Sequence, residues 1–141
     1  MASVNYTAET LRRSKTSRHL SQQKSNQHYS KLAEDLVAQF AKNRGWEILS
    51  RNFRRPGCEV DIIMMKQETL VGVEVKFRKR ATDINSLVPK KKGAAIVRGI
   101  ERFLELFACE PHTIRIDLAV VTLSGENIKL VQYVPAIFSH E

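Results

Sequence analysis

The chain has 141 residues, 43% of them apolar, which suffices for one globular core but leaves no room for a second full domain. Lysine and arginine outnumber acidic residues by 23 to 15, and the resulting charge of +8 favours a polyanionic partner such as nucleic acid. No apolar run reaches the roughly 18 residues of a membrane span, and the two cysteines form no disulfide framework, so we expect a cytoplasmic protein without a membrane partner.

The first thirty residues are polar and basic. They hold five basic residues against one acid and few apolar side chains, so folding them would bury too little surface to offset the lost entropy. We interpret residues 1–30 as a flexible basic tail that adds non-specific attraction to phosphates, and residues 31–141 as a single domain. A transit peptide is the alternative for this serine- and arginine-rich segment.

An amphipathic helix is predicted to begin near residue 30. Ser30 can cap it, apolar residues recur at helical spacing through Phe40, and Gly45 follows the last turn as a stop. Glu34 lies at the edge of the apolar arc, where its side chain could lean toward a site. An ordinary surface acid near the helix N-terminus is the alternative for this residue.

Strand patterns dominate the rest of the chain. Three β-like runs at 47–54, 59–65 and 69–77 are separated by turn residues and predict a meander. Apolar spacing predicts a second helix over 89–107, with Pro89 in its first turn, and two strands follow at 114–123 and 128–134. The order α-β-β-β-α-β-β predicts an α/β fold in which helices flank a mixed β-sheet.

Alternation within two of these strands gathers charge on one face. Because alternate residues point the same way, Asp61 shares a face with Glu59 and Ile63, while Glu74 and Lys76 share a face on the next strand. A four-residue loop at 66–69 pairs residues whose numbers sum to 135, which sets Asp61 opposite Glu74. A slip of one residue would put charges on the apolar face, although a slip of two stays open.

Two adjacent carboxylates repel each other, and a divalent cation relieves that repulsion. Mg²⁺ is often held by one or two carboxylates together with water and phosphate oxygens. Lys76 points to the same place and can neutralise charge on an attacked phosphate or orient a water. These three groups are the inventory for metal-assisted phosphodiester hydrolysis. For the triplet at 74–76 alone, a solvated strand face is the alternative, because acid-x-lysine is common.

The strand motifs resemble those of a known family. Cys-Glu-Val-Asp-Ile-Ile at 58–63 and Leu-Val-Gly-Val-Glu-Val-Lys-Phe-Arg at 70–78 look like the signature of the YraN-like uncharacterised family. Further matches lie at 33–36, 45–49, 51–54 and 115–117, so the resemblance spans about residues 30–138. It implies a restriction-endonuclease-like fold of the PD-(D/E)xK, Holliday-junction-resolvase-like kind, and makes 31–141 a single nuclease-like domain.

The resemblance also implies roles for particular residues. Asp61 and Glu74 would be metal ligands, the Val75 carbonyl would join them, Lys76 would be the catalytic lysine, and Glu34 would approach the site from the first helix. The cofactor would be Mg²⁺ or Mn²⁺. Resolvase-like relatives pair to cut two strands, which implies a homodimer. The chain departs from the pattern at 33, 58 and 72, where Ala, Cys and Gly replace the usual Gly, Gly and Phe, and no ligand is lost.

Basic residues cluster around these motifs. Residues 76–92 contain seven basic residues and one acid, and further arginines lie on the preceding strand and turn. Such side chains position nucleic acid through its phosphates without reading sequence, although a solvated loop is the alternative for 78–80. The predicted nucleic-acid-binding residues are Arg54, Arg55, Arg78, Lys79, Arg80, Lys90, Lys91 and Lys92.

Two functions remain open at this point. The first is a metal-dependent endonuclease that hydrolyses phosphodiester bonds in DNA, including branched or damaged DNA. The second is a non-catalytic nucleic-acid-binding protein on the same scaffold, because a fold hosts more than one function. The four histidines form no metal or triad constellation, and no glycine-rich phosphate loop is present, which argues against a nucleotide-hydrolysing motor.

Overall fold

The computed structural model describes residues 5–6, 22–80 and 90–140. Their elements follow the predicted order, preceded by one short additional strand. The elements are β1 (Asn5–Tyr6), α2 (Gln22–Lys42), β2 (Glu47–Arg55), β3 (Cys58–Lys66), β4 (Thr69–Arg78), α3 (Lys90–Phe107), β5 (Thr113–Ser124) and β6 (Asn127–His140).

The strands form one mixed sheet in the order β1-β6-β5-β4-β3-β2. β2, β3 and β4 make the predicted antiparallel meander, and β5 pairs with β6 in the same way. β4 and β5 are parallel from Thr69↔Thr113 to Arg78↔Thr122, and α3 lies between them in sequence. A parallel pair needs such a crossover, so the α-β-β-β-α-β-β order fixes where the sheet changes direction.

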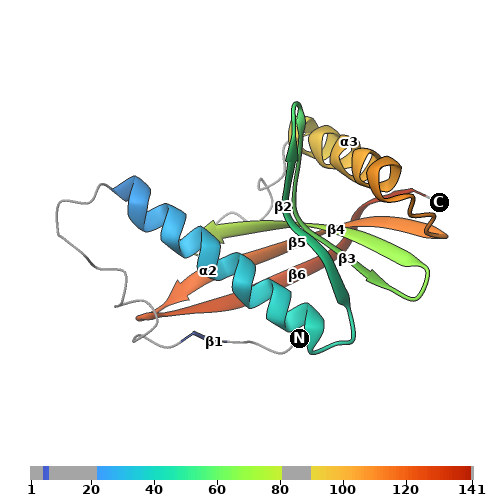
Figure 1. The fold of residues 1–141 in the computed structure, drawn as a ribbon. Coiled ribbons are helices and arrows are strands. Elements are labelled where there is room, and N and C mark those ends of the chain that lie inside the picture. Colours follow the sequence, from blue (N-terminus) through green and yellow to red (C-terminus); the bar gives the residue numbers. More distant parts are fainter. Residues whose placement is uncertain (1–4, 7–21, 81–89, 141) are drawn as a thin grey trace.

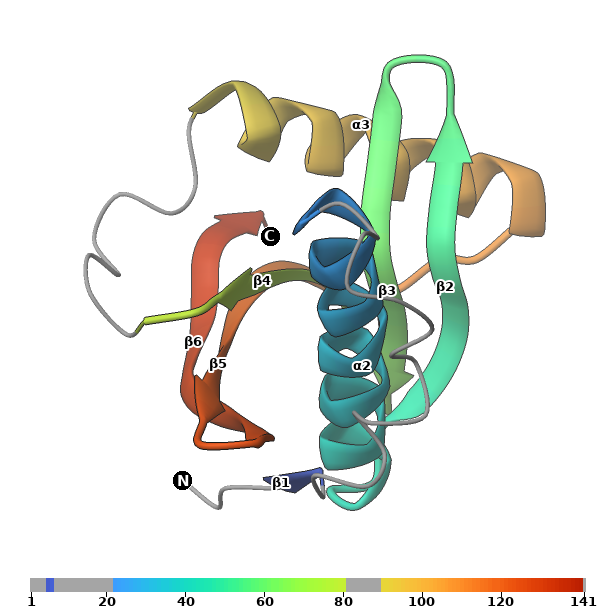
Figure 2. The same cartoon turned by 90° about the vertical axis from the view of Figure 1, so that its left-hand side faces the viewer.

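The two helices cover opposite faces of the sheet (Figures 1 and 2). The α2 side buries Leu36, Val37 and Phe40 of the helix against valines and isoleucines of the strands. The α3 side buries Ile96, Ile100 and Phe103 against a second set of strand residues. Each face therefore has its own apolar core, as expected for a sheet flanked by helices.

Helix α2 starts earlier than predicted. It begins at Gln22, so Ser30 lies inside the helix and does not cap it. The prediction placed the start at the first apolar residue, whereas the polar segment before that residue continues the same helix. Its other end is as predicted: Gly45 has φ +86°, a conformation that glycine adopts without steric cost, and the chain turns into β2.

The N-terminal segment is described only in part. Residues 1–4 and 7–21 of the predicted flexible tail lie outside the described residues. Asn5 and Tyr6 pair with Lys129 and Ile128 of β6, which places β1 at the edge of the sheet. Within the described part of the chain, no helix is both long and apolar enough to cross a membrane.

The predicted register between β3 and β4 is confirmed up to a definite point. The pairs run from Lys66↔Thr69 to Ile62↔Val73, and every pair sums to 135. Beyond Ile62↔Val73 no further pair joins these strands, although β3 stays paired with β2 and β4 with β5. β3 and β4 thus diverge there, as Figure 2 shows. We call this divergence the fork.

At the fork, the side chains of β2 and β3 that faced α2 give way to side chains that face α3. Arg51 reaches Asp35 on α2, yet Phe53, two residues on, packs edge-on against Phe103 of α3. On β3, likewise, Ile62 belongs to the α2 core and Val60 to the α3 core. The regular alternation predicted for this strand would put Val60 on the same face as Ile62 and Met64, and it is wrong at Val60.

The cause lies at Asn52, which by register stands opposite Asp61. Asn52 has φ +53°, a left-handed conformation that interrupts the regular alternation of β2. Asparagine tolerates this conformation better than most residues because its short polar side chain can bond locally. Beyond Asn52 the β2–β3 hairpin turns toward α3, where the Arg98 Nε donates to the Gly57 carbonyl at 3.1 Å.

α3 approaches the sheet closely at Gly72. A Cβ added to Gly72 would lie 2.7 Å from Cδ1 of Ile100 and 3.3 Å from Cγ1 of Val60. Both neighbours are buried and cannot move freely. The absence of a side chain at Gly72 therefore allows the close packing of α3 against β4.

Candidate active site

Three of the four predicted catalytic residues, Asp61, Glu74 and Lys76, lie at or next to the base of the fork, and Glu34 lies on α2. The last β3–β4 pair is Ile62↔Val73. Asp61 adjoins this pair on β3 and Glu74 adjoins it on β4, so both lie just beyond the paired region. The Val75 backbone N–H donates to Oδ2 of Asp61 at 2.8 Å. This bond sets the Asp61 carboxylate against the peptide group that joins Glu74 to Val75. Where the backbone ladder ends, the aspartate side chain takes over as acceptor.

Lys76 and Glu74 form a largely buried ion pair. The Lys76 Nζ lies 3.0 Å from Oε1 of Glu74, and the two side chains are 21% and 2% exposed. Asp61 is also buried, at 7%. Charges in such a place must be paired or hydrogen-bonded, because desolvating a lone ion is costly. Two groups of β4 supply that compensation: the Lys76 ammonium for Glu74 and the Val75 N–H for Asp61.

The donor set at the fork is chemically suited to a hard divalent cation. Asp61 and Glu74 offer carboxylate oxygens, which Mg²⁺ and Mn²⁺ prefer to nitrogen or sulfur. Within 5–6, 22–80 and 90–140, no three His, Cys, Asp or Glu side chains form a potential metal-binding group. A cation here would thus take at most two carboxylates and fill its other positions with backbone, water or phosphate oxygens.

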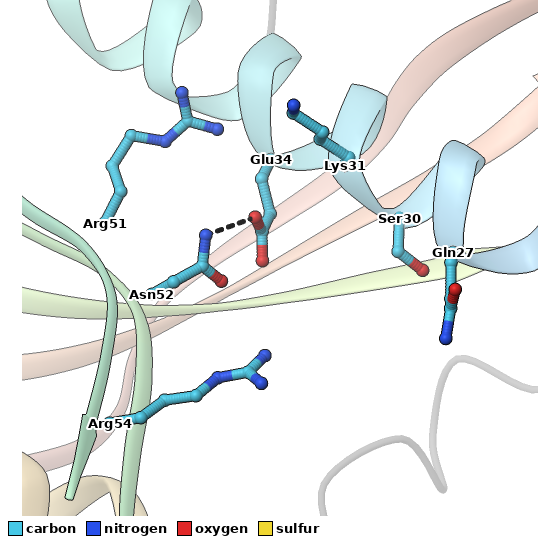
Figure 3. A pocket seen from close by; sticks show the side chains of 7 residues that line it. All are labelled: Gln27, Ser30, Lys31, Glu34, Arg51, Asn52 and Arg54. Carbon is cyan, nitrogen blue, oxygen red and sulfur yellow. Dashed lines mark hydrogen bonds between the residues drawn. The ribbon is translucent and has the colours of Figure 1, made fainter. Parts of the chain in front are cut away.

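Glu34 lies on α2 and faces β2. Its Oε2 accepts a hydrogen bond from the Asn52 Nδ2 at 3.1 Å (Figure 3). It lines a groove between α2 and β2, which we call the α2–β2 groove, of about 1040 Å³; the lining residues are Gln27, Ser30, Lys31, Glu34, Arg51, Asn52 and Arg54. Glu34 is thus linked to the strand position opposite Asp61 and does not complete a group of three acids.

The environment of Glu34 raises its pKa above the ordinary value of 4.5. Burial is the main cause, and it outweighs the hydrogen bond from Asn52 and the attraction of Arg51 and Arg54, which lower the pKa. Since the folded state holds the proton more tightly than the unfolded chain, this group favours folding below about pH 4.5. That contribution is lost as the pH rises through the folded pKa.

Replacing Glu34 by glutamine should therefore make the protein more stable than wild type at pH 7, with the difference shrinking toward pH 4. Glutamine still accepts the bond from Asn52 but carries no charge to desolvate. Urea denaturation between pH 4 and 7 measures the effect, with Glu105→Gln, an exposed carboxyl on α3, as the control. Parallel pH profiles for wild type and Glu34→Gln would contradict the prediction.

The predicted phosphate-binding residues are solvent-accessible where the structure describes them. Arg54, Arg55, Arg78, Lys79 and Arg80 are all exposed. Lys90, Lys91 and Lys92 form the first turn of α3, and their side chains lie outside the described part of the structure, as does Pro89.

Sequence reasoning missed one basic residue near this group. Arg98 of α3 is exposed and lines a hollow of about 400 Å³ together with Arg54, Arg55 and Cys58. It stands on the polar side of an amphipathic helix, and no local motif singles it out. Cys58 and Cys109 are both free, as predicted.

A second carboxylate at a break in the sheet has a structural role. Asp117 is fully buried, and the β5–β6 register shifts between Ile116 and Leu118, so that one side of Asp117 faces an interrupted ladder. Its carboxylate accepts bonds from Arg115 at 2.9 and 3.0 Å, from the Tyr133 hydroxyl at 2.5 Å and from the Ala136 N–H at 2.9 Å. We call these four residues the Asp117 network.

The Asp117 network explains two residues that the sequence singled out without a role. The bonds to Asp117 raise the pKa of Arg115. Burial together with the adjacent carboxylate raises the pKa of Tyr133, so its hydroxyl stays a donor. Asp117 therefore ties β5 to Tyr133 and Ala136 of β6, and Arg115 on the same strand compensates its charge. Tyr133 was missed because its 16-residue separation from Asp117 carries no local signal.

Comparison with known proteins assigns the family. The model of the Uncharacterised protein family UPF0102 matches residues 33–121, a span that includes Glu34, Asp61, Glu74 and Lys76. A UPF0102 protein of Fervidobacterium nodosum is 32% identical over 99 residues, which cover 70% of this chain and 74% of that protein.

Two further relatives carry the same family name. A UPF0102 protein of Campylobacter jejuni subsp. jejuni is 40% identical over 70 residues, 50% of this chain and 62% of the relative. One from Flavobacterium johnsoniae is 30% identical over 114 residues, 77% of this chain and 92% of the relative. The chain thus belongs to UPF0102, the YraN-like family that its strand motifs resemble.

Proposed function

We propose that the protein is a Mg²⁺- or Mn²⁺-dependent endonuclease that hydrolyses phosphodiester bonds in DNA, including branched or damaged DNA. The observation that carries this proposal is the arrangement at the fork. Asp61 is held on the Val75 N–H, Glu74 follows directly, and Lys76 is 3.0 Å from Glu74. Two acids and an ammonium thus gather where the sheet opens.

In this proposal the carboxylates of Asp61 and Glu74 and the carbonyl of Val75 hold the cation. The cation, when bound, supplies Lewis acidity for a phosphate oxygen and lowers the pKa of a bound water. The protein supplies placement: the Val75 N–H fixes the Asp61 carboxylate, and the ion pair with Lys76 fixes Glu74. Preorganised ligands of this kind need not be reordered at the moment of reaction.

Lys76 has a role of its own. Its side chain is 21% exposed while Glu74 is almost fully buried, so Lys76 is the more accessible member of the pair. Its ammonium can stabilise negative charge that develops on the phosphate during attack, or orient the attacking water. Glu34 acts more remotely, through its bond to Asn52 opposite Asp61.

The surroundings suit a polyanion. Five exposed basic side chains lie near the two strands of the fork. Arg54 and Arg55 end β2, which pairs with β3, Arg78 ends β4, and Lys79 and Arg80 follow it. They would hold the phosphates of a duplex on either side of the site, and affinity would then fall steeply with salt. A homodimer would offer one such site to each DNA strand. Two free cysteines fit a reducing, cytoplasmic setting.

One observation favours the second candidate, a nucleic-acid-binding protein that does not cut. Asp61 is 7% exposed and Glu74 1%, and both already have compensating partners in Val75 and Lys76. A site that is stable in this way persists without a cation. Under this alternative the fork would be a structural element, and the basic surface alone would carry the function.

Cleavage assays with Asp61→Asn separate the two candidates. The protein is incubated with duplex, flapped, four-way and single-stranded DNA in Mg²⁺ or Mn²⁺, and the variant is expected to lose cleavage while it keeps binding. Asparagine retains an oxygen acceptor for the Val75 N–H, so the fold should survive, and thermal melting checks this. Glu105→Gln on α3 serves as the control.

The outcomes are distinct. Cleavage lost in Asp61→Asn but kept in Glu105→Gln supports the nuclease. Equal cleavage by wild type and Asp61→Asn would point to a contaminating enzyme. Binding by wild type without cleavage on any substrate and with either metal would favour the non-catalytic protein.

A further inference from the structure

The α2–β2 groove has walls unlike those of most small-molecule pockets. One wall is the first half of α2, with Gln27, Ser30 and Glu34, and the other is β2, with Asn52 and Arg54 (Figure 3). Every lining residue that the structure describes is polar or charged. Pockets for compact organic ligands are mostly apolar and hold about 300–1,000 Å³. A polar groove of about 1040 Å³ suits a longer, hydrated and charged ligand.

The charges in the groove favour an anion. Among the described lining residues, Lys31, Arg51 and Arg54 contribute three cations and Glu34 contributes one carboxyl. Arg51 also pairs with Asp35 at 2.5 Å, and Arg54 with Glu59 at 3.5 Å. A guanidinium has five N–H donors, and exposed pairs of this kind are worth only about 0–1 kcal/mol, so phosphate can share or replace these partners.

The position of the groove connects it to the fork. In the register of β2 and β3, Arg51 is opposite Ile62 and Phe53 is opposite Val60. Asn52, whose side chain lies in the groove, is therefore opposite Asp61. A ligand that lies along β2 between Lys31 and Arg54 therefore passes one strand away from the proposed catalytic carboxylate. Asn52 is thus the lining residue that stands next to Asp61 on the neighbouring strand.

We propose that the α2–β2 groove binds an unpaired strand of nucleic acid, with Lys31, Arg51 and Arg54 on its phosphates and Gln27, Ser30 and Asn52 on its bases. The inference rests on the proposed function, since it names the part of the substrate that lies beside the fork. Amide and hydroxyl groups both donate and accept, as base edges require. In a duplex those edges are engaged in pairing, whereas an unpaired strand exposes them.

The hydrogen bond from Asn52 holds the Glu34 carboxyl beside β2, on the wall of the groove. Three cations among the described lining residues outnumber this one acid, so the groove still attracts phosphate.

The test compares two triple variants that remove the same charge. Lys31→Gln, Arg51→Gln and Arg54→Gln empty the groove of cations, whereas Lys42→Gln, Lys66→Gln and Arg102→Gln remove three exposed cations elsewhere. Fluorescence anisotropy measures the Kd of a labelled single-stranded oligonucleotide and of a blunt duplex of the same sequence. EDTA is present, so that no cleavage occurs.

The groove variant should bind the single strand at least tenfold more weakly. The negative slope of log K against log salt should become shallower by about 2, since each of the three phosphate contacts contributes roughly 0.7. Duplex affinity should fall less than single-strand affinity, because Arg54 is the one residue of the three that is also proposed to hold duplex phosphates. Equal effects of the two triple variants, an equal loss for duplex and single strand, or no wild-type binding to the single strand would each overturn the inference.

Two further measurements keep the result interpretable. Thermal melting verifies that the variants fold, and Lys31→Gln alone, at an exposed helix position, provides a mild version in which the same selective loss should be smaller. Asp61→Asn distinguishes this inference from the nuclease proposal. Cleavage that depends on Asp61 without a selective groove effect rejects only the groove, and selective strand binding without cleavage rejects only the nuclease.

Discussion

Replacing Lys76 by alanine should slow phosphodiester cleavage about 10²–10³-fold, the usual effect of removing one preorganised group that stabilises transition-state charge. The Lys76 ammonium lies 3.0 Å from Glu74 and is the more exposed member of the pair, so its loss removes positive charge at the point where phosphate charge would develop. Single-turnover cleavage at saturating Mg²⁺ measures the rate. Binding of DNA in EDTA should change little.

The lysine substitution has its own controls. Because it leaves Glu74 buried without its ammonium, Lys76→Met, which keeps most of the side-chain volume, is compared in thermal melts and in cleavage. Lys42→Ala, at the exposed end of α2, removes a positive charge far from the fork in sequence. A Lys76 variant that is folded and cuts at the wild-type rate would contradict a catalytic role for this residue.

Replacing Asp117 by alanine should destabilise the folded state by about 3–5 kcal/mol, the cost of breaking a buried ion pair by removing one partner. The substitution leaves the Arg115 guanidinium, the Tyr133 hydroxyl and the Ala136 N–H without their acceptor. A small domain has only about 5–15 kcal/mol of stability in total, so much of it would be lost. Urea denaturation followed by circular dichroism measures the change.

Asp35 provides a matched comparison. It also pairs with an arginine, Arg51, but the two side chains are 33% and 37% exposed. Asp35→Ala should therefore cost at most about 1 kcal/mol. If the two aspartate variants lost similar amounts of stability, burial would not be the source of the strength of the Asp117 network.

The strands and their register were predictable because each depends on neighbours in sequence. Apolar alternation located β2, β3, β4 and β5 to within a residue or two. The short loop between β3 and β4 fixed the pairing, and a slip of one residue would have exposed a whole apolar face. The crossover at α3 followed from element order alone, because consecutive strands with a helix between them pair in parallel.

The fork and the Asp117 network were not predictable in this way. At the fork, the left-handed Asn52 reverses the sides of β2, and the Asp61 carboxylate takes over a backbone acceptor role. Both depend on how β2 and β3 pack against α2 and α3, and the alternation of apolar residues within a strand carries no information about that packing. An asparagine within a strand, a residue type depleted there, was the one available signal. The Asp117 network unites residues that only the folded sheet brings together.

The bond between Asp61 and the Val75 amide has an evolutionary consequence. Folding alone demands an oxygen acceptor at position 61, whatever chemistry the protein performs. A paralogue that gave up catalysis would thus be free to exchange this aspartate for asparagine, but hardly for alanine. Such an exchange would mark descendants that kept the architecture and abandoned the cation.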